Sequence, residues 1–591
     1  MASFSRLNGY DVKDNTARFN IGDITQLNTS AKENIVSAIN EHNTKLVGLT
    51  ENAKGLTENV HHILKYNAVG DDTTDNTSIL NNLISSIGDD NAIIIIDEGT
   101  YLISGNVTIP SNIVIEFIGE LDITGNLTIN GEIKSPLKQI FKGTGTLTIN
   151  DGKNSIGYPE WFGAKINDDT TNNEEGINKC INIFPTTIFQ SGNYYISDTI
   201  NVNTAGKTLK GVSNKTTIIM KDNFNKIMHV GFTSFPSEVN SLPRYFNISD
   251  IILTRNTTQY ITGSIGLHTE YLLYGNFTNV IVRESCDNFL INGVVATKFN
   301  NCTSFNTTLD SDDTTRVINS FGIDGFSDIP LAGNNASLYL NGCNASFGGI
   351  CYNLCHGLNI IGNYRLADIY IDKFECAMPY IGIEINGFNT TSGNDIFITN
   401  CVIDAYKEHG IYVHGFDNSS NINIDGNYIA PSSNAITPSN FGIRIENTGN
   451  TNVVNNQIIC DPSTACLPLW YNNCVNVNSV GNMIMNPGRA IFFNSSDNIR
   501  SIDLIRNTTI RNNNEPAINC SNITRSYIHP SINCTDGYIN GGVALNSSNK
   551  NEINITQIKG VANGSNNFIK IDNVAITTTG VTGTNLISGI F

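Results

Sequence analysis

Three carboxylates in the second half of the chain have the pattern of catalytic groups. Glu384 lies between Ile383 and Ile385, so its side chain is expected to face outward from a strand whose isoleucines face the core. Glu446 and Asp372 have equivalent outward positions in other short alternating segments. Two carboxylates within about 5–10 Å of each other can perform the acid/base and nucleophilic steps of sugar hydrolysis. We therefore expect at least one of the three to be catalytic.

The same alternation points aromatic and basic side chains outward beside these carboxylates. The expected substrate-binding residues are Tyr412, Arg444, His414, Trp470 and Tyr370. Aromatic rings stack on sugar rings and an arginine pairs with phosphate, so the set suits a sugar polymer or a polyanion. Outward residues of a rod can instead line subunit interfaces or face solvent. His268, His356 and His409 are expected at the surface or in turns, outside the site.

Two series of short apolar segments must position these residues. The first series begins with Gly, Ala or Cys at positions 382, 410, 442, 466, 490 and 517. The second series places apolar residues at Ile371, Ile398, Ile424, Val454, Val480 and Ile505. Two series that share one period of roughly 24 to 32 residues are typical of a solenoid. Short strands with alternating side chains favour an all-β fold, a right-handed parallel β-helix, over a sandwich or a propeller.

Asparagine recurs after the second series. The repeated positions are Asn400, Asn427, Asn456, Asn482 and Asn507. Stacked asparagine side chains can satisfy the backbone groups of turns at the corners of successive coils. We therefore expect most of the asparagine to be structural.

The composition excludes several classes of protein. The chain of 591 residues has 35 Lys and Arg against 53 Asp and Glu, so a nucleic-acid partner is not expected. No apolar run is long enough for a transmembrane helix, and residues 1–10 lack the pattern of a secretory signal, so no membrane partner is expected. The 13 cysteines lack zinc-binding spacing and are expected to be buried thiols. No metal or other cofactor is expected, although a divalent cation at residues 310–313 is an open alternative.

The N-terminal region has a helical pattern. Ser30 and Glu33 can form a capping box in front of apolar residues spaced by three and four. These residues are Ile35, Ile39, Leu46, Leu49, Ala53, Leu56, Val60 and Ile63, with His42 at one position. So narrow a stripe predicts a self-associating coiled coil, and the residues do not choose between a dimer and a trimer. A short amphipathic helix packed on its own domain is the alternative.

Two polar motifs precede predicted helices. Residues 66–77 precede an apolar helix at 79–87, and residues 167–171 precede another near 176–184. Both motifs resemble the segment that caps the first coil of pectate-lyase-like β-helices, although Asp72 stands where that segment has its second glycine. The resemblance implies two successive β-helical pieces. The expected domains are 1–65 for an attachment segment and coiled coil, 66–157 for a first β-helical or cap region, 158–530 for the main parallel β-helix, and 531–591 for a small C-terminal β-domain.

Residues 21–41, with the sequence IGDITQLNTSAKENIVSAINE, resemble a phrase common in structural proteins of phages with Gram-positive hosts. With the caps and the coils, the chain is similar to podovirus tailspikes, or preneck appendages. The resemblance implies a virion protein that is made in the host cytoplasm and forms a homotrimer. It also implies N-terminal attachment to neck or tail proteins, and digestion of wall teichoic acid or capsular polysaccharide by a glycosidase or phosphodiesterase.

Two other functions stay open at this point. The same rod can bind the polymer without cutting it, or serve as a structural fibre, because a fold does not determine a function. An eliminating lyase is less expected, because carboxylates outnumber the Lys and Arg bases in the expected groove.

Overall fold

The computed structural model contains two compact units, which are described separately. The N-terminal unit comprises residues 1–136 and 140–154, and the C-terminal unit comprises residues 137–139 and 155–591. The residues that the structure describes are 4–7, 10–13, 39–47, 59–150, 152–213, 215–221, 226–234, 243–256, 261–306, 318–324, 335–347, 355–362, 366–387, 395–416, 420–432, 440–460, 466–485, 491–506, 518–533, 543–546, 548, 551–555, 557–559, 569–571, 574–576, 580–582 and 585–589.

The N-terminal unit contains a short parallel β-helix with three small sheets, and β1 (Phe4–Leu7) and β2 (Tyr10–Lys13) form a separate antiparallel pair. β5 (Ala92–Ile96) has the sequence AIIII and buries every second side chain. It pairs in parallel with β3 (Val60–His62) on one side and β8 (Ile113–Phe117) on the other. The other strands are β4 (Asp71–Asp75), β6 (Thr100–Ile103), β7 (Asn106–Ile109), β9 (Glu120–Ile123), β10 (Asn126–Ile129), β11 (Ile133–Lys134), β12 (Phe141–Lys142) and β13 (Thr146–Ile149).

Each unit contains one of the two predicted helices, so both helix predictions are confirmed. α3 (Thr77–Ile87) buries Leu80 and Leu83 in the N-terminal unit. α4 (Glu174–Ile183) buries Ile177 in the C-terminal unit. In each motif an aspartate accepts hydrogen bonds from threonines two or three residues later, as a turn requires. The motifs therefore build caps rather than a catalytic site.

The last two apolar positions of the predicted coiled coil are not part of a long helix in the structure. Residues 39–47 are helical, and Ile39 and Leu46 are exposed. Val60, however, lies in β3, and Ile63 is buried in the short helix η2 (Ile63–Tyr66). These two side chains belong to the first coil of the N-terminal unit, because β3 is paired with β5 there. The stripe positions Ile35, Leu49, Ala53 and Leu56 lie outside the described residues.

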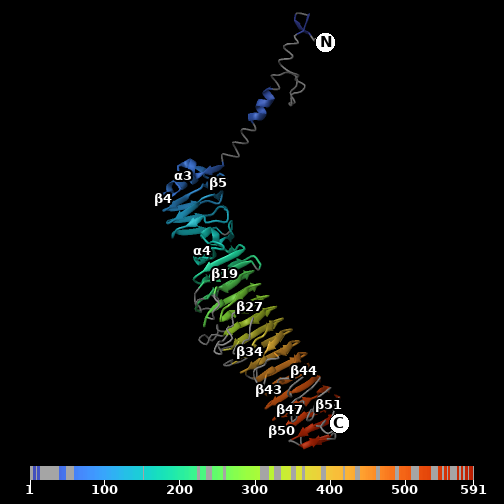
Figure 1. Ribbon diagram of the computed structural model, residues 1–591. Coiled ribbons are helices and arrows are strands. Elements are labelled where there is room, and N and C mark those ends of the chain that lie inside the picture. The colour runs from blue at the N-terminus through green and yellow to red at the C-terminus, as the bar shows by residue number, and fades with distance from the viewer. Residues whose placement is uncertain are drawn as a thin grey trace. The chain divides into compact units, whose positions relative to one another are not determined.

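The C-terminal unit is a parallel β-helix, which confirms the predicted fold class. Figure 1 shows its strands stacked as successive coils, and each strand pairs with the equivalent strand of the next coil. The central coils have three strands each, which we assign to faces A, B and C. Figure 1 labels strands from each face.

Face A contains the candidate site. Its strands are β20 (Met228–Gly231), β23 (Ile265–Thr278), β25 (Asp287–Val295), β28 (Ile318–Asp324), β31 (Cys355–Ile361), β34 (Ile381–Asn386), β37 (His409–His414), β40 (Phe441–Thr448), β43 (Leu467–Cys474), β45 (Ile491–Asn494) and β47 (Ile518–Ser521). Face B includes β29 (Asn335–Asn341), β32 (Leu366–Asp372), β35 (Asp395–Thr399), β38 (Asn421–Asp425), β41 (Asn450–Val454), β44 (Val477–Met485) and β46 (Arg500–Arg506). Face C includes β30 (Asn344–Phe347), β33 (Glu375–Ala377), β36 (Val402–Tyr406), β39 (Tyr428–Pro431) and β42 (Gln457–Ile459).

The core follows the predicted series closely as far as Ile424. Beyond it the second series is shifted by one residue, and its last member, Ile505, pairs with Ile484 in a different buried row. Face A stacks Ile383, Ile411, Ile443 and Leu469, all fully buried. On face B, Ile371, Ile398 and Ile424 stack as predicted. The next residue in that row is Val453 rather than the predicted Val454, and Val480 is shifted with it. The reason is that Thr451 and Val453 are the buried pair of β41, so Val454 alternates outward.

A buried asparagine ladder holds the corner between faces B and C. The side-chain amide of Asn427 donates to Oδ1 of Asn456, and that of Asn456 donates to Oδ1 of Asn482, each at a distance of 2.9 Å. The same oxygens accept backbone N–H groups of the preceding coil. These three predicted positions are confirmed. Asn400 instead lies one residue before the ladder and donates to Asp372, and Asn507 lies outside the described residues.

We expect the Asn456→Ala substitution to lower the free energy of unfolding by about 3 kcal/mol, because it leaves several buried hydrogen-bonding groups without partners. The midpoint of denaturant unfolding measures this effect. The matched control is Asn450→Ala, which removes a link of an exposed asparagine row. Its expected cost is below about 1 kcal/mol, because water replaces the lost partner. Equal effects of the two variants would contradict a special role for the buried ladder.

The coils continue beyond residue 530, past the predicted start of a separate β-domain. β50 (Val543–Asn546) pairs in parallel with β47, and β51 (Glu552–Ile555) with β48 (Tyr527–Ile528). Two antiparallel hairpins follow, formed by β53 (Ile569–Ile571) with β54 (Val574–Ile576) and by β55 (Gly580–Thr582) with β56 (Asn585–Gly589). β56 also pairs in parallel with β51, so the hairpins close the end of the parallel sheet.

The cysteines of the described residues are buried and form no disulfide with one another, which confirms the prediction of buried thiols. Burial raises the pKa of Cys180 and Cys401 to about 12, so these thiols remain protonated and unreactive. Among the described helices, none combines the length and the apolar character needed to span a membrane.

Candidate functional site on face A

The outward residues of face A form the row that the alternation predicts. Glu384 of β34 pairs in register with Tyr412 of β37, then with Arg444 of β40 and Trp470 of β43. Two residues further along the strands, His414 pairs with Glu446. Neighbouring strands of a sheet lie about 4.8 Å apart, so these side chains are close neighbours. The structure thus brings together two of the three predicted carboxylates and four of the five predicted binding residues.

A glycine at the same position of β31, β34, β37 and β40 adds a second outward row that simple alternation misses. A Cβ atom at Gly410 would lie 2.6 Å from the carbonyl oxygen of Gly442 and would also touch Ile429 in the core. The glycine therefore faces inward, as does the buried Ile411 that follows it. With two successive inward positions, His409 and Tyr412 both point away from the core and their rings lie 4.7 Å apart. His409 and Tyr412, which are three residues apart in the sequence, therefore share one outward surface.

Glu384 is held between two histidines from neighbouring coils. Its Oε1 lies 3.0 Å from Nε2 of His414, and its Oε2 lies 2.7 Å from Nε2 of His356. Burial alone would raise the pKa of Glu384, but the two imidazoles lower it to about 2. The carboxylate is therefore ionised at neutral pH, which suits a base or a nucleophile rather than an acid.

Glu446 is the acceptor of a second polar group on the same face. Arg444 donates to its Oε1 from Nε at 3.1 Å and from Nη2 at 2.9 Å. The hydroxyl of Tyr412 donates to its Oε2 at 3.0 Å. The Arg444 guanidinium also lies over the rings of Tyr412 and Phe441, at 4.7 and 4.8 Å from their centres. Burial raises the pKa of Tyr412 to about 12, so its hydroxyl keeps its proton.

The two polar groups are connected by ring stacking. The centres of the Tyr412 and His414 rings lie 4.1 Å apart and the ring planes are inclined by only 17°. Tyr412, which donates to Glu446, therefore stacks on His414, which contacts Glu384. Trp470 lies beyond them, 5.8 Å from the ring of Phe441. Its buried Nε1 has no hydrogen-bond partner among the described residues.

Asp372 and Tyr370 are not part of this cluster, because they lie on face B. Asp372 accepts hydrogen bonds from Thr399 and Asn400, both at a distance of 2.9 Å, and its carboxylate lies 3.3 Å from the Lys373 ammonium. Tyr370 stacks between Tyr339 and Phe397, with ring centres 4.7 and 4.9 Å away. This half-buried aromatic row is a separate outward surface.

The three histidines predicted at the surface or in turns are buried on face A. His356 contacts Glu384, and the ring of His409 lies between those of Tyr412 and Phe441. His268 lies further back on the same face, in β23. His409 directly precedes Gly410 of the repeating series, and His356 precedes Gly357, which extends that series by one coil and packs against Gly382. Their inclusion adds imidazole groups to a site expected to depend on carboxylates.

The buried histidines predict how stability depends on pH. Burial, followed by the nearby Arg444, lowers the pKa of His409 from 6.5 to about 3. Since the folded state disfavours the proton, neutral His409 stabilises the fold above about pH 6.5, and this contribution is lost as the pH falls towards 3. Between pH 7 and pH 5 we expect the unfolding midpoint to fall less in the His409→Phe variant than in the unaltered protein. His529→Gln is the control, and an equal change in both variants would contradict the prediction.

The arrangement provides the ionised Glu384, a second carboxylate, imidazoles, a guanidinium and aromatic rings on one surface. Such a set can bind a sugar polymer or a phosphate and can transfer protons during hydrolysis. Both carboxylates have nitrogen or hydroxyl donors as partners. The predicted cation stretch at residues 310–313 lies outside the described residues.

Comparison with known proteins gives a partial match. Residues 60–150 match the family described as rhamnogalacturonase A/epimerase, pectate lyase-like. This segment belongs to the N-terminal unit, whereas the candidate site lies in the C-terminal unit. No curated protein matches the chain.

Several solved structures are similar to the chain at low identity. Tailspike protein 3 of bacteriophage CBA120 is 12% identical with a TM-score of 0.40, and the match covers 73% of this chain and 61% of that one. The gp42 tailspike of Acinetobacter phage vb_AbaP_AS12 is 11% identical with a TM-score of 0.31, covering 75% and 62%. The surface adhesin PfbA of Streptococcus pneumoniae is 12% identical with a TM-score of 0.35, covering 70% and 92%. The chain thus spans about three fifths of each tailspike chain, and these matches assign no role to any residue.

Proposed function

We propose that the protein is a phage tailspike whose face A binds and hydrolyses a host cell-surface glycopolymer, with wall teichoic acid or capsular polysaccharide as the substrate. The observation that carries the proposal is the pair Glu384 and Glu446, which lie on one face and are linked through Tyr412 and His414. The sequence resemblance to podovirus tailspikes of Gram-positive hosts supports the biological setting. In that setting the chain is a homotrimer attached to neck or tail proteins by its N-terminus.

In the proposed reaction Glu384 acts as the base or nucleophile, because its low pKa keeps it ionised. His414 is the candidate proton donor, since it contacts Glu384 and its side chain is 20% exposed. Arg444 orients an anionic or polar group of the polymer beside Glu446, and Trp470 provides an aromatic surface. Cleavage of a glycosidic bond or of a phosphodiester is compatible with these groups.

The test is incubation of the purified full chain with wall teichoic acid and with capsular polysaccharide, followed by mass spectrometry of the released material. Repeating fragments are expected, and their end groups separate glycosidic from phosphodiester cleavage. Intact polymer that sediments with the protein would rule out the hydrolase.

Binding without cleavage is a second candidate function. The row of Tyr339, Tyr370 and Phe397 on face B favours it, because it places aromatic rings on an outward surface away from Glu384 and Glu446. The Tyr370→Ala substitution separates the two functions. Under the binding proposal it weakens co-sedimentation of the polymer, whereas under the hydrolase proposal cleavage depends on face A.

A further inference from the structure

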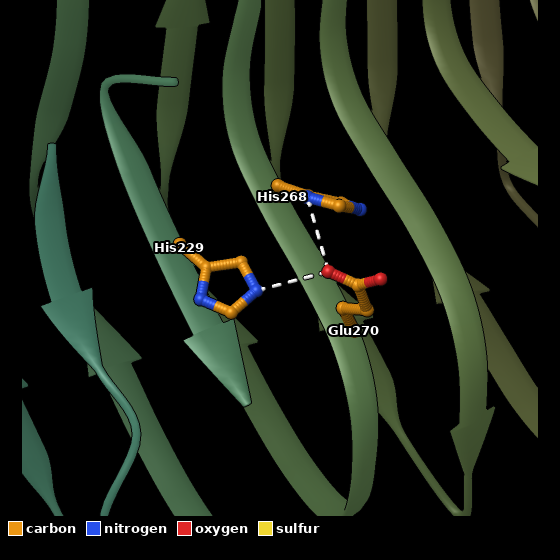
Figure 2. A group of neighbouring side chains, drawn as sticks. All are labelled: His229, His268 and Glu270. Atoms are coloured by element: carbon orange, nitrogen blue, oxygen red, sulfur yellow. Dashed lines mark hydrogen bonds and ion pairs between the residues drawn. The ribbon is translucent and has the colours of Figure 1, made fainter. Parts of the chain in front are cut away.

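A second cluster of titratable side chains lies on face A, three coils before the Glu384 cluster. His229 of β20 pairs in register with His268 of β23, and Glu270 follows two residues later on β23. Figure 2 shows both rings and the carboxylate pointing toward one another, with the two dashed lines meeting at one carboxylate oxygen. None of these three residues takes part in the proposed hydrolysis.

The distances in this cluster approach those of a metal site. Oε2 of Glu270 lies 3.1 Å from Nε2 of His229 and 3.6 Å from Nδ1 of His268. The three ligand atoms lie within 4.8 Å of one another. Ligands of a tetrahedral zinc ion, with bonds of about 2.1 Å, lie about 3.4 Å apart. The two separations that involve Glu270 therefore match those of a zinc site. The ligand nitrogens of His229 and His268 need only a small approach toward each other to complete the geometry.

The cluster is buried and its hydrogen bonding is incomplete. His229, His268 and Glu270 are 2%, 5% and 8% exposed. Neither ring nitrogen of His268 has a hydrogen-bond partner among the described residues. Oδ1 of Asn292, the residue paired with Glu270 on the next coil, also lacks one. Buried polar atoms without partners are costly, and their concentration here indicates that the site binds something further.

We propose that His229, His268 and Glu270 bind a divalent transition-metal ion, with zinc as the best match. Two imidazoles and one carboxylate are a ligand set that zinc accepts, whereas calcium and magnesium prefer oxygen ligands alone. Because the ligands come from adjacent strands and are buried, the ion cross-links two successive coils and has a structural role. The proposal goes beyond the hydrolase and does not depend on it.

A lysine competes with the metal for the same carboxylate. The Lys226 ammonium lies 3.8 Å from Oε2 of Glu270, and the Lys226 side chain is 32% exposed. A bound dication would repel this ammonium, and the exposed lysine side chain is free to turn toward solvent. We therefore expect Lys226→Gln to strengthen metal binding several-fold, the opposite of the effect of removing a ligand.

The test uses the full chain, stripped with a chelator and then titrated with zinc under calorimetry. Mass spectrometric metal analysis after removal of free zinc gives the stoichiometry. One zinc per chain is expected, together with an increase in unfolding temperature. Replacing zinc by cobalt(II) should give the visible absorption of a four-coordinate site, in which a water molecule completes the three protein ligands. These measurements on the unaltered protein require no variant to fold.

The variants then assign the ligands. His229→Gln, His268→Gln and Glu270→Gln should each weaken zinc binding at least about tenfold. The matched control is His61→Gln in the N-terminal unit, which should retain full zinc binding. Absence of a stoichiometric zinc at micromolar concentration, or zinc binding unaffected by His268→Gln, would overturn the proposal. Polymer cleavage is measured separately, so failure of the metal site is distinguishable from failure of the hydrolase.

Discussion

The Glu384→Gln variant is expected to cut the glycopolymer at least about 100-fold more slowly than the unaltered protein while still binding it. Glutamine keeps the size of the side chain but removes the negative charge that His356 and His414 contact. Because only the ionised carboxylate can act as base or nucleophile, the loss should appear in the rate of cleavage rather than in binding. Release of fragments over time, measured beside co-sedimentation of the polymer, separates the two.

The matched control for this variant is Asp395→Asn. Asp395 is an outward carboxylate of face B that accepts a hydrogen bond from Asn421, so the substitution removes a similar charge away from the cluster. Its cleavage rate should stay within about twofold of the unaltered protein, well inside the scatter of ordinary surface changes. Wild-type cleavage by Glu384→Gln, with the fold intact by circular dichroism, would remove Glu384 from the proposed mechanism.

The second large effect is expected from Gly410→Ala. The added Cβ would lie 2.6 Å from the carbonyl oxygen of Gly442, a backbone atom that cannot move away without shifting the next coil. We expect a loss of about 3 kcal/mol in the free energy of unfolding, at the upper end for overpacked cores. Since Gly410 lies between the outward residues His409 and Tyr412, displacement of the strand should also misalign Tyr412 and reduce cleavage. Denaturant unfolding and fragment release measure the two effects.

Gly322→Ala provides the control on the same face. A Cβ atom there would be 3.5 Å or more from its nearest neighbours, which is ordinary contact. Its effect on stability should be below about 0.5 kcal/mol. If both alanine variants were equally stable, the close approach at Gly410 would not explain why a small residue recurs in this series.

The sequence predicts the solenoid and most of its face A well, because strand alternation has a strict period of two. That rule was sufficient to align Glu384 with Tyr412 and Arg444. It failed for His356 and His409, because the inward glycine beside each of them inserts a second buried position. The misplacement of Val454 has a similar origin, since an apolar residue at a strand end fits either side of the alternation.

Other features depend on arrangement in space rather than on local pattern. Asp372 has the same outward alternation as Glu384, but it belongs to a different face, and the residues that connect two faces do not reveal the angle between them. The His229 and His268 pair was hidden because 39 residues separate two positions that adjacent coils place side by side. The stripe of the predicted coiled coil ran into β3, since Val60 and Ile63 satisfy a heptad as readily as a buried coil.

The buried asparagine ladder also bears on how such a protein changes during evolution. Asn427 and Asn456 each bond to the equivalent asparagine one coil further on, so the coils that carry the ladder present the same connection at their upper and lower edges. Duplication or loss of one whole coil would therefore restore the ladder, whereas an insertion of a few residues within a strand would break it. A gain or loss of whole coils at the ladder would change the length of this parallel β-helix in steps of about 4.8 Å.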